Sequence, residues 1–435
     1  MRFLKKKPAE QLVDMMLRIY RNGMTTTSGG NLSIKDDEGN IWITPGGTDK
    51  GSMTPEDIVC MKPDGTMVGN HRPSVELPFH SSIYRIRPDI KAIVHAHPPA
   101  LVAFSTVRRI PDVRLTEASY SLCSQIAMAP YAIPGSQVLG DYICEEFKKG
   151  ANLVMLENHG VVAGGCDMWE AFTRFETLDF TARMQMDSLR FGTPTTLPSA
   201  RMEELSGCCC CCCGCGSEFT LVAHTATAEE QSLRNELAAF TRRSYSQRLF
   251  TSYWGGFSAR LGKDAFLLAP DVADPMDIQP EDFVFVSGNE AEEGKTVCDC
   301  AQLHLAVYRA HPEINAIANA QPASLMAFAL TDTRLDTCTI PESFINLRDV
   351  PRLPYSAAHE NVGQLTKTLG AATPAVLVGN EGIVVVGGTL LQAFDRLEVA
   401  DYTARALVGC TGLGNVVNIV GKDVDDIVEF FNLPK

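Results

Sequence analysis

The chain carries one sequence pattern twice, and this repeat limits its possible folds more than any other feature. Framework residues of the first half recur at a nearly constant distance in the second half. At an offset of 225 residues, one set matches: Pro45, Pro55, Glu56, Asp57 and Val59 against Pro270, Pro280, Glu281, Asp282 and Val284. The offset falls to 224 between His80 and His304 and to 222 between Gly160 and Gly382, as short loop deletions would produce.

The repeat predicts two domains of the same fold, and a length of 435 residues favours the same division. We place a first copy at residues 1–205 and a second copy at 218–435. Residues 206–217 contain the run Cys208–Cys213 and Cys215 between glycines and serines, and we interpret them as a Cys/Gly-rich linker. Soft-metal binding or lipidation is the alternative interpretation of these cysteines.

Each copy shows the same coarse order of helices and strands. In the first copy we expect helices at Pro8–Asn22, Val75–Ile86 and Met168–Leu189, and strands at Leu32–Lys35, Ile41–Thr44, Ile58–Lys62, Ala92–His97 and Asn152–Glu157. Strands and helices mix here without strict βαβ alternation. The pattern therefore predicts the α/β class, with two tandem layered α/β/α domains, each having a mostly antiparallel central sheet flanked by helices.

Composition narrows the choice of partners and compartment. The net charge of −14 argues against nucleic acid or a membrane surface as a partner, since those partners require basic patches. The N-terminus has no signal-peptide core, and no run of 18 apolar residues occurs elsewhere. The eight cysteines outside the run are scattered, as in a reducing compartment. We therefore expect a cytoplasmic protein.

The repeat also serves as an internal control for function. Four residues of the first copy with possible chemical roles all change in the second: Glu76, His95, His97 and His159 become Cys300, Asn319, Gln321 and Glu381. Framework residues around them persist, so their joint loss indicates one shared role. His80 persists as His304, which favours a packing role for it over metal ligation.

The three lost histidines fit a catalytic metal site. His95 and His97 are two residues apart on an expected strand and would share one face, although such a pair alone is also typical of a hydrogen-bonded surface site. His159 follows another strand in an expected tight turn. Three imidazoles with an open fourth position are typical of catalytic zinc. Glu76 could fill that position and then act as general base; alternatively, it is a helix-start acid following an N-cap at Ser74.

Glycine-rich turns beside these residues favour an anionic ligand. Gly30 and Asn31 can present backbone N–H groups to oxygens, as can the turn Pro45–Gly47 and a helix start at Ser74. Such turns are also common without any ligand. Lys50 could add a positive charge, but we expect its side chain to be solvated.

In combination, these motifs resemble the class II aldolase/adducin family. The resemblance rests on S-G-G-N-L-S at 28–33, I-T-P-G-G at 43–47, R-P-S-V-E at 72–76, H-A-H at 95–97, A-P-Y-A at 129–132 and E-N-H-G at 157–160. They occur in the family's order and cover most of the first copy. The second copy resembles the same fold without the metal ligands.

The resemblance implies a role for each residue that matches a motif. His95, His97 and His159 would bind Zn2+ or another divalent metal, Glu76 would be the acid/base, and the phosphate pocket would comprise Gly30, Asn31, Gly47 and Ser74. Glu117 and Tyr120 lie where the family carries further acid/base groups. Val75 and Gly46 depart from the family, because aldolases usually have hydroxyl residues there that bind phosphate.

The activity implied is that of a zinc-dependent aldolase, a lyase that cleaves or forms a carbon–carbon bond of a small sugar or sugar phosphate with enediolate stabilisation. A pentulose-phosphate 4-epimerase or a related dehydratase is the alternative, although the epimerases carry Asp at the Glu76 position. An adducin-like scaffold is the non-enzymatic alternative, and the retained histidines oppose it. The family forms tetrameric rings, so we expect a homodimer of two-domain chains that builds a pseudo-tetramer.

Overall fold

The computed structural model describes residues 1–207, 219–270 and 273–433. The chain folds as two compact units, one of Met1–Val113 with Ala118–Arg183 and one of Arg114–Glu117 with Met184–Lys435. The division falls inside a long helix, whereas the ranges 1–205 and 218–435 refer to the sequence copies. Residues 208–217 of the predicted linker lie outside the described residues.

The first unit is built on an eight-stranded sheet with the order β4-β3-β2-β1-β5-β8-β7-β6. All neighbouring strands are antiparallel except the pair β6 and β7. The strands are β1 (Asn31–Lys35), β2 (Ile41–Ile43), β3 (Val59–Met61), β4 (Met67–Val68), β5 (Ala92–Ala96), β6 (Ile126–Ala129), β7 (Leu153–Leu156) and β8 (Val161–Gly165).

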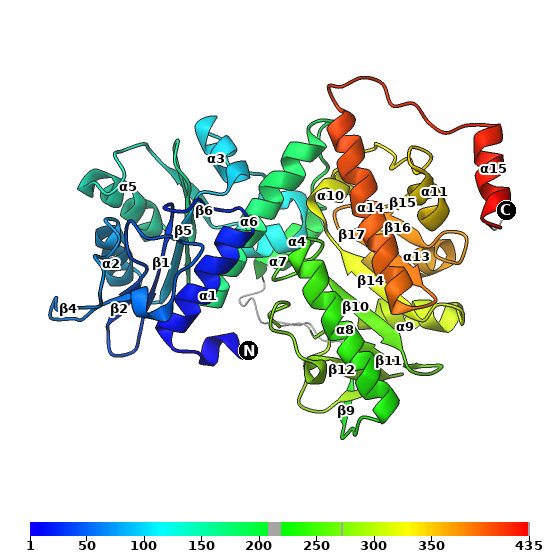
Figure 1. Cartoon of the computed structure of the whole chain (residues 1–435), viewed down its shortest axis with the longest axis horizontal. Coiled ribbons are helices and arrows are strands. Elements are labelled where there is room, and N and C mark those ends of the chain that lie inside the picture. Colours follow the sequence, from blue (N-terminus) through cyan, green and yellow to red (C-terminus); the bar gives the residue numbers. More distant parts are fainter. Residues whose placement is uncertain (208–218, 271–272, 434–435) are drawn as a thin grey trace. The chain divides into compact units, whose positions relative to one another are not determined.

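Helices cover both faces of this sheet, with α2 and α5 on one face and α1 and α6 on the other (Figure 1). Alternation along β5 sends Val94 into the core beneath α1 and α6, and sends Ile93 into the core beneath α2 and α5. The helices are α1 (Pro8–Arg21), α2 (Leu77–Ile86), α3 (Pro99–Thr106), α4 (Glu117–Cys123), α5 (Gln137–Lys148) and α6 (Met168–Ser188).

The second unit contains a nine-stranded sheet with the order β15-β16-β17-β14-β10-β11-β12-β13-β9. It is also mostly antiparallel; only the pairs β13–β9 and β15–β16 run parallel among the described strands. The strands are β9 (Thr220–Val222), β10 (Gly256–Arg260), β11 (Ala265–Leu268), β12 (Val284–Ser287), β13 (Glu290–Glu292), β14 (Ala316–Ala320), β15 (Arg352–Leu353), β16 (Ala375–Val378) and β17 (Gly382–Gly387).

Helices again lie on both faces of this sheet. Residues of α9 and α13 join one core, whereas Phe240 of α8 and Phe394 of α14 stack beside Phe257 on the other face. The helices are α7 (Ser199–Gly207), α8 (Ala228–Ser246), α9 (Ala301–Ala310), α10 (Ala323–Leu330), α11 (Pro341–Leu347), α12 (Ser356–His359), α13 (Val362–Thr368), α14 (Leu390–Cys410) and α15 (Lys422–Phe430). Two layered α/β/α domains with mostly antiparallel sheets are thus confirmed.

The strand register shows that the two sheets are copies. Asn31 of β1 pairs with His95 of β5, and Gly256 of β10 pairs with Asn319 of β14. On the other side, His95 pairs with Val162, and Asn319 pairs with Val384. The offsets of 225, 224 and 222 residues therefore describe equivalent places in the two folds.

Most expected elements of the first copy form within two residues of their predicted ends. One difference affects the site: helix α2 begins at Leu77, so Glu76 occupies the N-cap position and Ser74 does not, contrary to our expectation. Another is that β5 ends at Ala96, which leaves His97 just beyond the strand.

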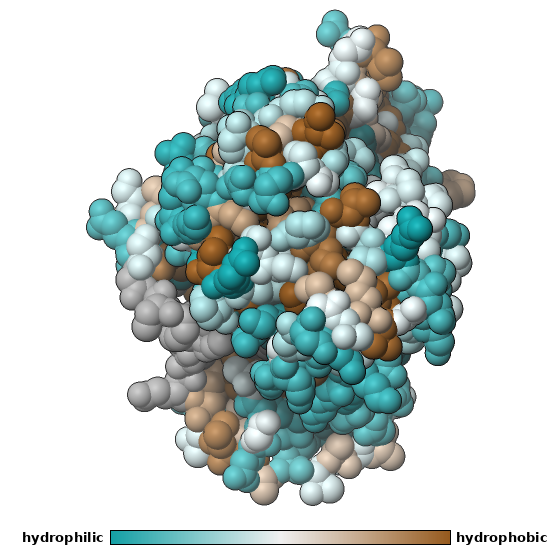
Figure 2. Space-filling model, turned by 90° about the vertical axis from the view of Figure 1, so that its left-hand side faces the viewer, coloured by the Kyte–Doolittle hydropathy of each residue, from teal (hydrophilic) through white to brown (hydrophobic). Residues whose placement is uncertain are grey.

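The described surface offers no membrane-crossing element. None of the described helices combines the length and the hydrophobicity that a transmembrane span needs. On the face shown in Figure 2, apolar side chains form small separate patches within a largely hydrophilic surface.

Candidate metal centre

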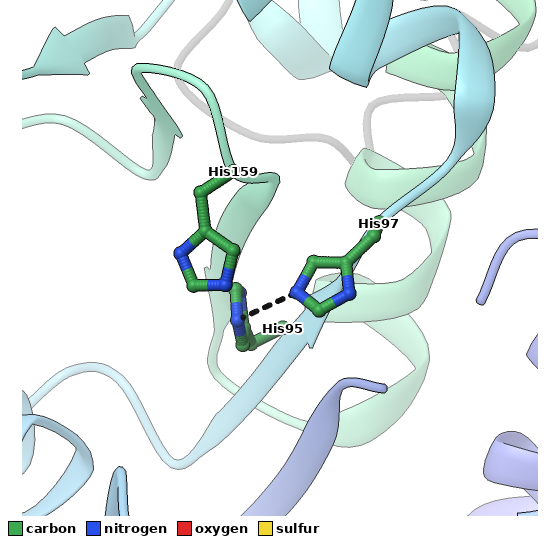
Figure 3. Close-up of side chains that lie close together, drawn as sticks. All are labelled: His95, His97 and His159. Carbon is green, nitrogen blue, oxygen red and sulfur yellow. Dashed lines mark hydrogen bonds between the residues drawn. The ribbon is translucent and has the colours of Figure 1, made fainter. Parts of the chain in front are cut away.

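Three histidines of the first copy converge at one end of the sheet (Figure 3). One ligand nitrogen from each of His95, His97 and His159 lies within 4.8 Å of the others. The ring centroids are 4.9 Å apart for His95 and His97, 5.0 Å for His95 and His159, and 4.7 Å for His97 and His159. The sequence prediction that these side chains form one cluster therefore agrees with the geometry.

Strand β5 and the turn after β7 place these side chains. His95 is fully buried, and its Nδ1–H donates to the Val161 carbonyl at 3.0 Å, which directs Nε2 into the cluster. Asn158 has a left-handed backbone with φ of +56°, a conformation that asparagine tolerates well. This residue turns the chain so that His159 comes back toward β5.

Gly160 allows the turn to approach β5 closely. A Cβ atom at this position would lie 2.5 Å from the Ala96 carbonyl oxygen and 2.5 Å from Cδ2 of His97. Any larger residue would therefore push the His159 turn away from the other two histidines.

Glu76 lies directly beside the cluster. Its Oε2 is 3.2 Å from Nε2 of His95 and accepts a hydrogen bond of 2.7 Å from the Asn31 side-chain amide. Only 6% of Glu76 is exposed. Burial by itself would raise the pKa of this carboxyl, but the charge of His95 and hydrogen bonds from His95 and Asn31 outweigh it and leave the pKa well below its ordinary value.

The imidazoles differ in their proton affinity. Burial would lower the pKa of His95, but the adjacent Glu76 carboxylate raises it above the ordinary value. Burial, together with the charge of His95, lowers the pKa of His97 to about 3 and that of His159 to about 4. Two of the three rings are therefore neutral at physiological pH, which is the form that binds a metal.

The donor set fits a divalent cation. Three imidazole nitrogens with a carboxylate beside them are typical of catalytic zinc. One buried polar atom beside the cluster, Oε1 of Glu76, has no hydrogen-bond partner among the described residues. A cation coordinated here would give this oxygen a reason for its burial.

A buried hydrogen-bond chain supports Glu76 from behind. The Tyr84 hydroxyl lies 2.6 Å from Ser33 Oγ, and Ser33 Oγ lies 2.7 Å from Nδ1 of His80. Nε2 of His80 lies 2.6 Å from Oδ1 of the Asn31 side chain. The side-chain NH2 group of Asn31 then donates to Glu76. Burial lowers the pKa of His80 to about 3, so this ring is neutral and can donate from Nε2 while accepting at Nδ1.

This hydrogen-bond chain shows the roles of two residues. His80 has a structural role, as expected, because its ring links Ser33 to Asn31. Asn31 uses its side chain on Glu76 and His80, so any contact it makes with an anion has to come from its backbone. Ser33 and Tyr84 are not among the predicted site residues, although their retention as Ser258 and Tyr308 is a signal in the sequence.

The other predicted anion-binding residues cluster nearby in the same unit. A bridge between Pro45 and Pro73 holds the turn that contains Gly47 next to the segment that contains Ser74. Gly47 is exposed with φ of +70°, and Ser74 Oγ accepts the Glu76 backbone N–H at 3.2 Å. Gly30 has φ of +72°, and a Cβ there would lie 2.7 Å from the His95 carbonyl oxygen.

The Lys50 side chain is buried, contrary to our expectation that it would be solvated. It is only 1% exposed, and Nζ donates to the Pro45 carbonyl at 2.6 Å, so it holds the turn rather than extending into water. Burial lowers its pKa to about 8.

The Glu117 carboxylate is held by hydrogen bonds from two other side chains. Arg201 donates to its two carboxylate oxygens at 2.7 and 3.0 Å, and the Tyr355 hydroxyl donates to it as well. These contacts make Glu117 a structural anchor in the second compact unit.

Comparison with known proteins identifies the family. Residues 10–186 and 235–408 both match the family described as Class II Aldolase and Adducin N-terminal domain. The chain belongs to this family. Two matches in one chain also show the tandem duplication.

Individual relatives match one copy at a time. The chain is 32% identical over 208 residues to a 5-deoxy-D-ribulose 1-phosphate aldolase of Bacillus thuringiensis serovar kurstaki. The aligned region covers 47% of this chain and 95% of the relative. It is 30% identical to a 3-oxo-tetronate 4-phosphate decarboxylase of Haemophilus influenzae, with 43% and 92% covered. It is 31% identical to an L-fuculose phosphate aldolase of Methanocaldococcus jannaschii, with 41% and 96% covered.

A solved structure described as L-fuculose 1-phosphate aldolase is also similar, with 30% identity, a TM-score of 0.41, and 46% of this chain and 94% of that chain covered. Aldolases and decarboxylases recur among the curated relatives named above, which makes an enzyme the expectation for this chain.

Proposed function

We propose that the first copy is a zinc-dependent aldolase that cleaves or forms a carbon–carbon bond of a small sugar phosphate. The observation that carries the proposal is the placement of Glu76, with its carboxylate 3.2 Å from a cluster of three histidines and held there by Asn31. A lone histidine cluster could be structural, but a buried, ionised carboxylate beside it supplies a proton acceptor at the same place.

His95, His97 and His159 would hold the metal. When bound, a divalent cation supplies electrophilic stabilisation for negative charge that develops on substrate oxygens. The exposed turn at Gly47 and the segment at Ser74 supply N–H and hydroxyl donors for a phosphate group, because the Pro45–Pro73 bridge keeps them together.

Glu76 would carry the proton. Its low pKa keeps the carboxylate ionised at neutral pH, so it can accept the proton of a substrate hydroxyl as the neighbouring carbon–carbon bond breaks. The electron pair of that bond passes into the adjacent carbonyl group as an enediolate, and the other fragment leaves as an aldehyde. Asn31 and His80 are positioning residues, since they fix the carboxylate through hydrogen bonds.

The test uses the purified full chain. It should contain a divalent metal when prepared without chelator, and it should cleave 5-deoxy-D-ribulose 1-phosphate or L-fuculose 1-phosphate into a ketone phosphate and an aldehyde, which coupled dehydrogenases detect. Chelation should abolish the activity and Zn2+ should restore it. A chain that holds no divalent metal and releases no aldehyde contradicts the proposal.

A decarboxylase is the second candidate, because the relative from Haemophilus influenzae carries that activity at 30% identity. Both reactions leave an electron pair beside a carbonyl group, so the same site could serve either one. Release of carbon dioxide from a 3-oxo acid phosphate, without aldehyde from the ketose phosphates, would favour the decarboxylase. Inversion at C4 of a pentulose phosphate would indicate the epimerase instead.

We also propose that two chains associate through their tandem copies into a pseudo-tetramer. Two family domains per chain support this, since a dimer then contains four such domains. Sedimentation equilibrium should give twice the chain mass. A monomer with full activity contradicts the proposal.

A further inference from the structure

The second copy carries a cysteine pair at the positions of the first copy's Ser74 and Glu76. The repeat register matches Ser74 with Cys298 and Glu76 with Cys300. Both segments lead into equivalent helices, α2 and α9, and Glu76 and Cys300 occupy the two N-cap positions.

The backbone of this segment is the same in both copies. In the first copy the Glu76 N–H donates to Ser74 Oγ at 3.2 Å, and in the second the Cys300 N–H donates to Cys298 Sγ at 3.4 Å. The turn has therefore been kept while its side chains changed from a hydroxyl and a carboxylate to two thiols.

This turn brings the two sulfurs together. Cys298 Sγ and Cys300 Sγ are 2.7 Å apart, both residues are partly exposed, and neither is in a disulfide. A disulfide needs Cα atoms within about 7 Å, and two residues along one chain cannot be much further apart than that. Closing the bond thus requires only a small movement of the sulfurs.

Three other thiols of the described chain differ from this pair in being buried. Cys60, Cys123 and Cys144 are buried, and burial raises the pKa of each thiol. Such thiols stay protonated and react slowly, because the thiolate is the nucleophile in exchange. The pair at 298 and 300 is accessible, and an N–H donor is directed at one of its sulfurs.

We propose that Cys298 and Cys300 form a redox-active dithiol that exchanges with low-molecular-weight disulfides of the glutathione type. The thiolate of one cysteine attacks the small disulfide, forming a mixed disulfide and releasing one small thiol. The thiolate of the other cysteine then attacks the protein sulfur of the mixed disulfide and displaces the second small thiol. The protein pair is oxidised, the small disulfide is reduced, and the two protein protons end on the two released thiols.

The site needs neither the metal nor the proposed activity of the first copy. It would make the second copy a redox-sensitive domain rather than only a scaffold.

Mass spectrometry tests the proposal on the full-length chain. Trypsin releases residues 296–309 as one peptide whose two cysteines are this pair. The folded protein is incubated with glutathione disulfide in excess over glutathione and quenched with acid, and free thiols are then blocked with iodoacetamide in denaturant. The peptide should then carry neither alkyl group, and its mass should be two hydrogens less than that of the unalkylated dithiol peptide. Dithiothreitol before blocking should restore both alkyl groups.

Two results overturn the proposal. In one, the peptide keeps both alkyl groups under the oxidising mixture. In the other, it is linked to another cysteine peptide, including the one that contains Cys208–Cys213. The peptide that contains the buried Cys123 is the internal control and should stay alkylated throughout.

Single variants test the exchange route. Cys298→Ser and Cys300→Ser each remove one sulfur with little change in volume, and each should trap one glutathione on the remaining cysteine as a stable mixed disulfide. Absence of that adduct in both variants contradicts the two-step exchange. Thermal unfolding at the wild-type temperature verifies that each variant is folded.

Discussion

The two copies share a scaffold and differ in what one end of it carries. In the first copy the trio Ser33, His80 and Tyr84 is joined through Asn31 to Glu76. In the second copy the same trio forms: His304 Nδ1 and the Tyr308 hydroxyl each lie 2.7 Å from Ser258 Oγ. The trio is thus a property of the fold rather than of the chemistry.

Among the described residues of the second copy, the trio is not joined to a carboxylate as it is in the first; His304 interacts instead with the side chain of Asn319. Gly256 stands where Asn31 stands in the first copy, and Asn319 takes the strand position of His95. A neutral amide therefore replaces an imidazole, and the bridge from the histidine to a carboxylate is lost. The two copies therefore keep the hydrogen-bonded trio of the fold, whereas the four residues proposed to share a chemical role are lost together.

The largest expected effect is loss of the metal from the first copy. His95→Ala removes the fully buried member of the proposed ligand set, and we expect metal affinity to fall by more than about 100-fold and activity to disappear. Metal content by inductively coupled plasma mass spectrometry and turnover of the ketose phosphates measure this. Asn319→Ala changes the equivalent position and should alter neither; equal losses in both variants would break the comparison.

Glu76→Gln should affect turnover more than metal content. The amide keeps the size of the side chain but cannot accept a proton, so kcat should fall by about 10² to 10⁴. Glu381→Gln makes the same chemical change at the second-copy position of His159 and should leave kcat unchanged. If Glu76→Gln retains wild-type kcat, Glu76 is not the acid/base.

Glycine-to-alanine variants distinguish an effect on stability from an effect on metal binding. Gly160 and Gly382 are equivalent, and a Cβ at either would clash with a backbone carbonyl, that of Ala96 or of Ala320. Each variant should lower the free energy of unfolding by about 2 to 3 kcal/mol in urea denaturation. Only Gly160→Ala should also weaken metal binding; a similar metal loss in Gly382→Ala would contradict the assignment of the site to the first copy.

An effect on stability alone, present only above about pH 4, concerns a carboxyl retained in both long helices. Burial raises the pKa of Asp401 to about 6, with Arg405 at 3.9 Å opposing and Asp187 adding to the shift. Because the folded-state pKa is above the unfolded value, the folded chain binds more protons between about pH 4 and 6, and stability falls as pH rises through this window.

Asp401→Asn removes this dependence. At pH 7 the variant should be more stable than the wild type by at most about 3 kcal/mol, and the difference should vanish near pH 4 in urea titrations. Asp179→Asn should gain nothing, because Asp179 accepts from Arg183 at 2.9 Å. A gain at Asp179 equal to that at Asp401 would show that the two helices are electrostatically alike.

The duplication, the layered fold and the grouping of Glu76, His95, His97 and His159 could all be predicted from the amino-acid sequence. Repeat register and hydrophobic alternation are local and periodic, so they can be read along the chain. The loss of four residues against a retained framework predicts that they belong together, and the structure brings all four together at one end of the sheet.

Only the tertiary structure decided how these residues interact. The prediction for Asn31 concerns its backbone N–H, whereas strand pairing gives its side-chain amide a further contact with Glu76, 45 residues away in sequence. Lys50 was expected in water and is buried against the Pro45 carbonyl. Hydrogen bonds between distant residues and the desolvation of a side chain depend on which strands pair and which helix covers them. For that reason the lowered pKa of Glu76 follows from packing.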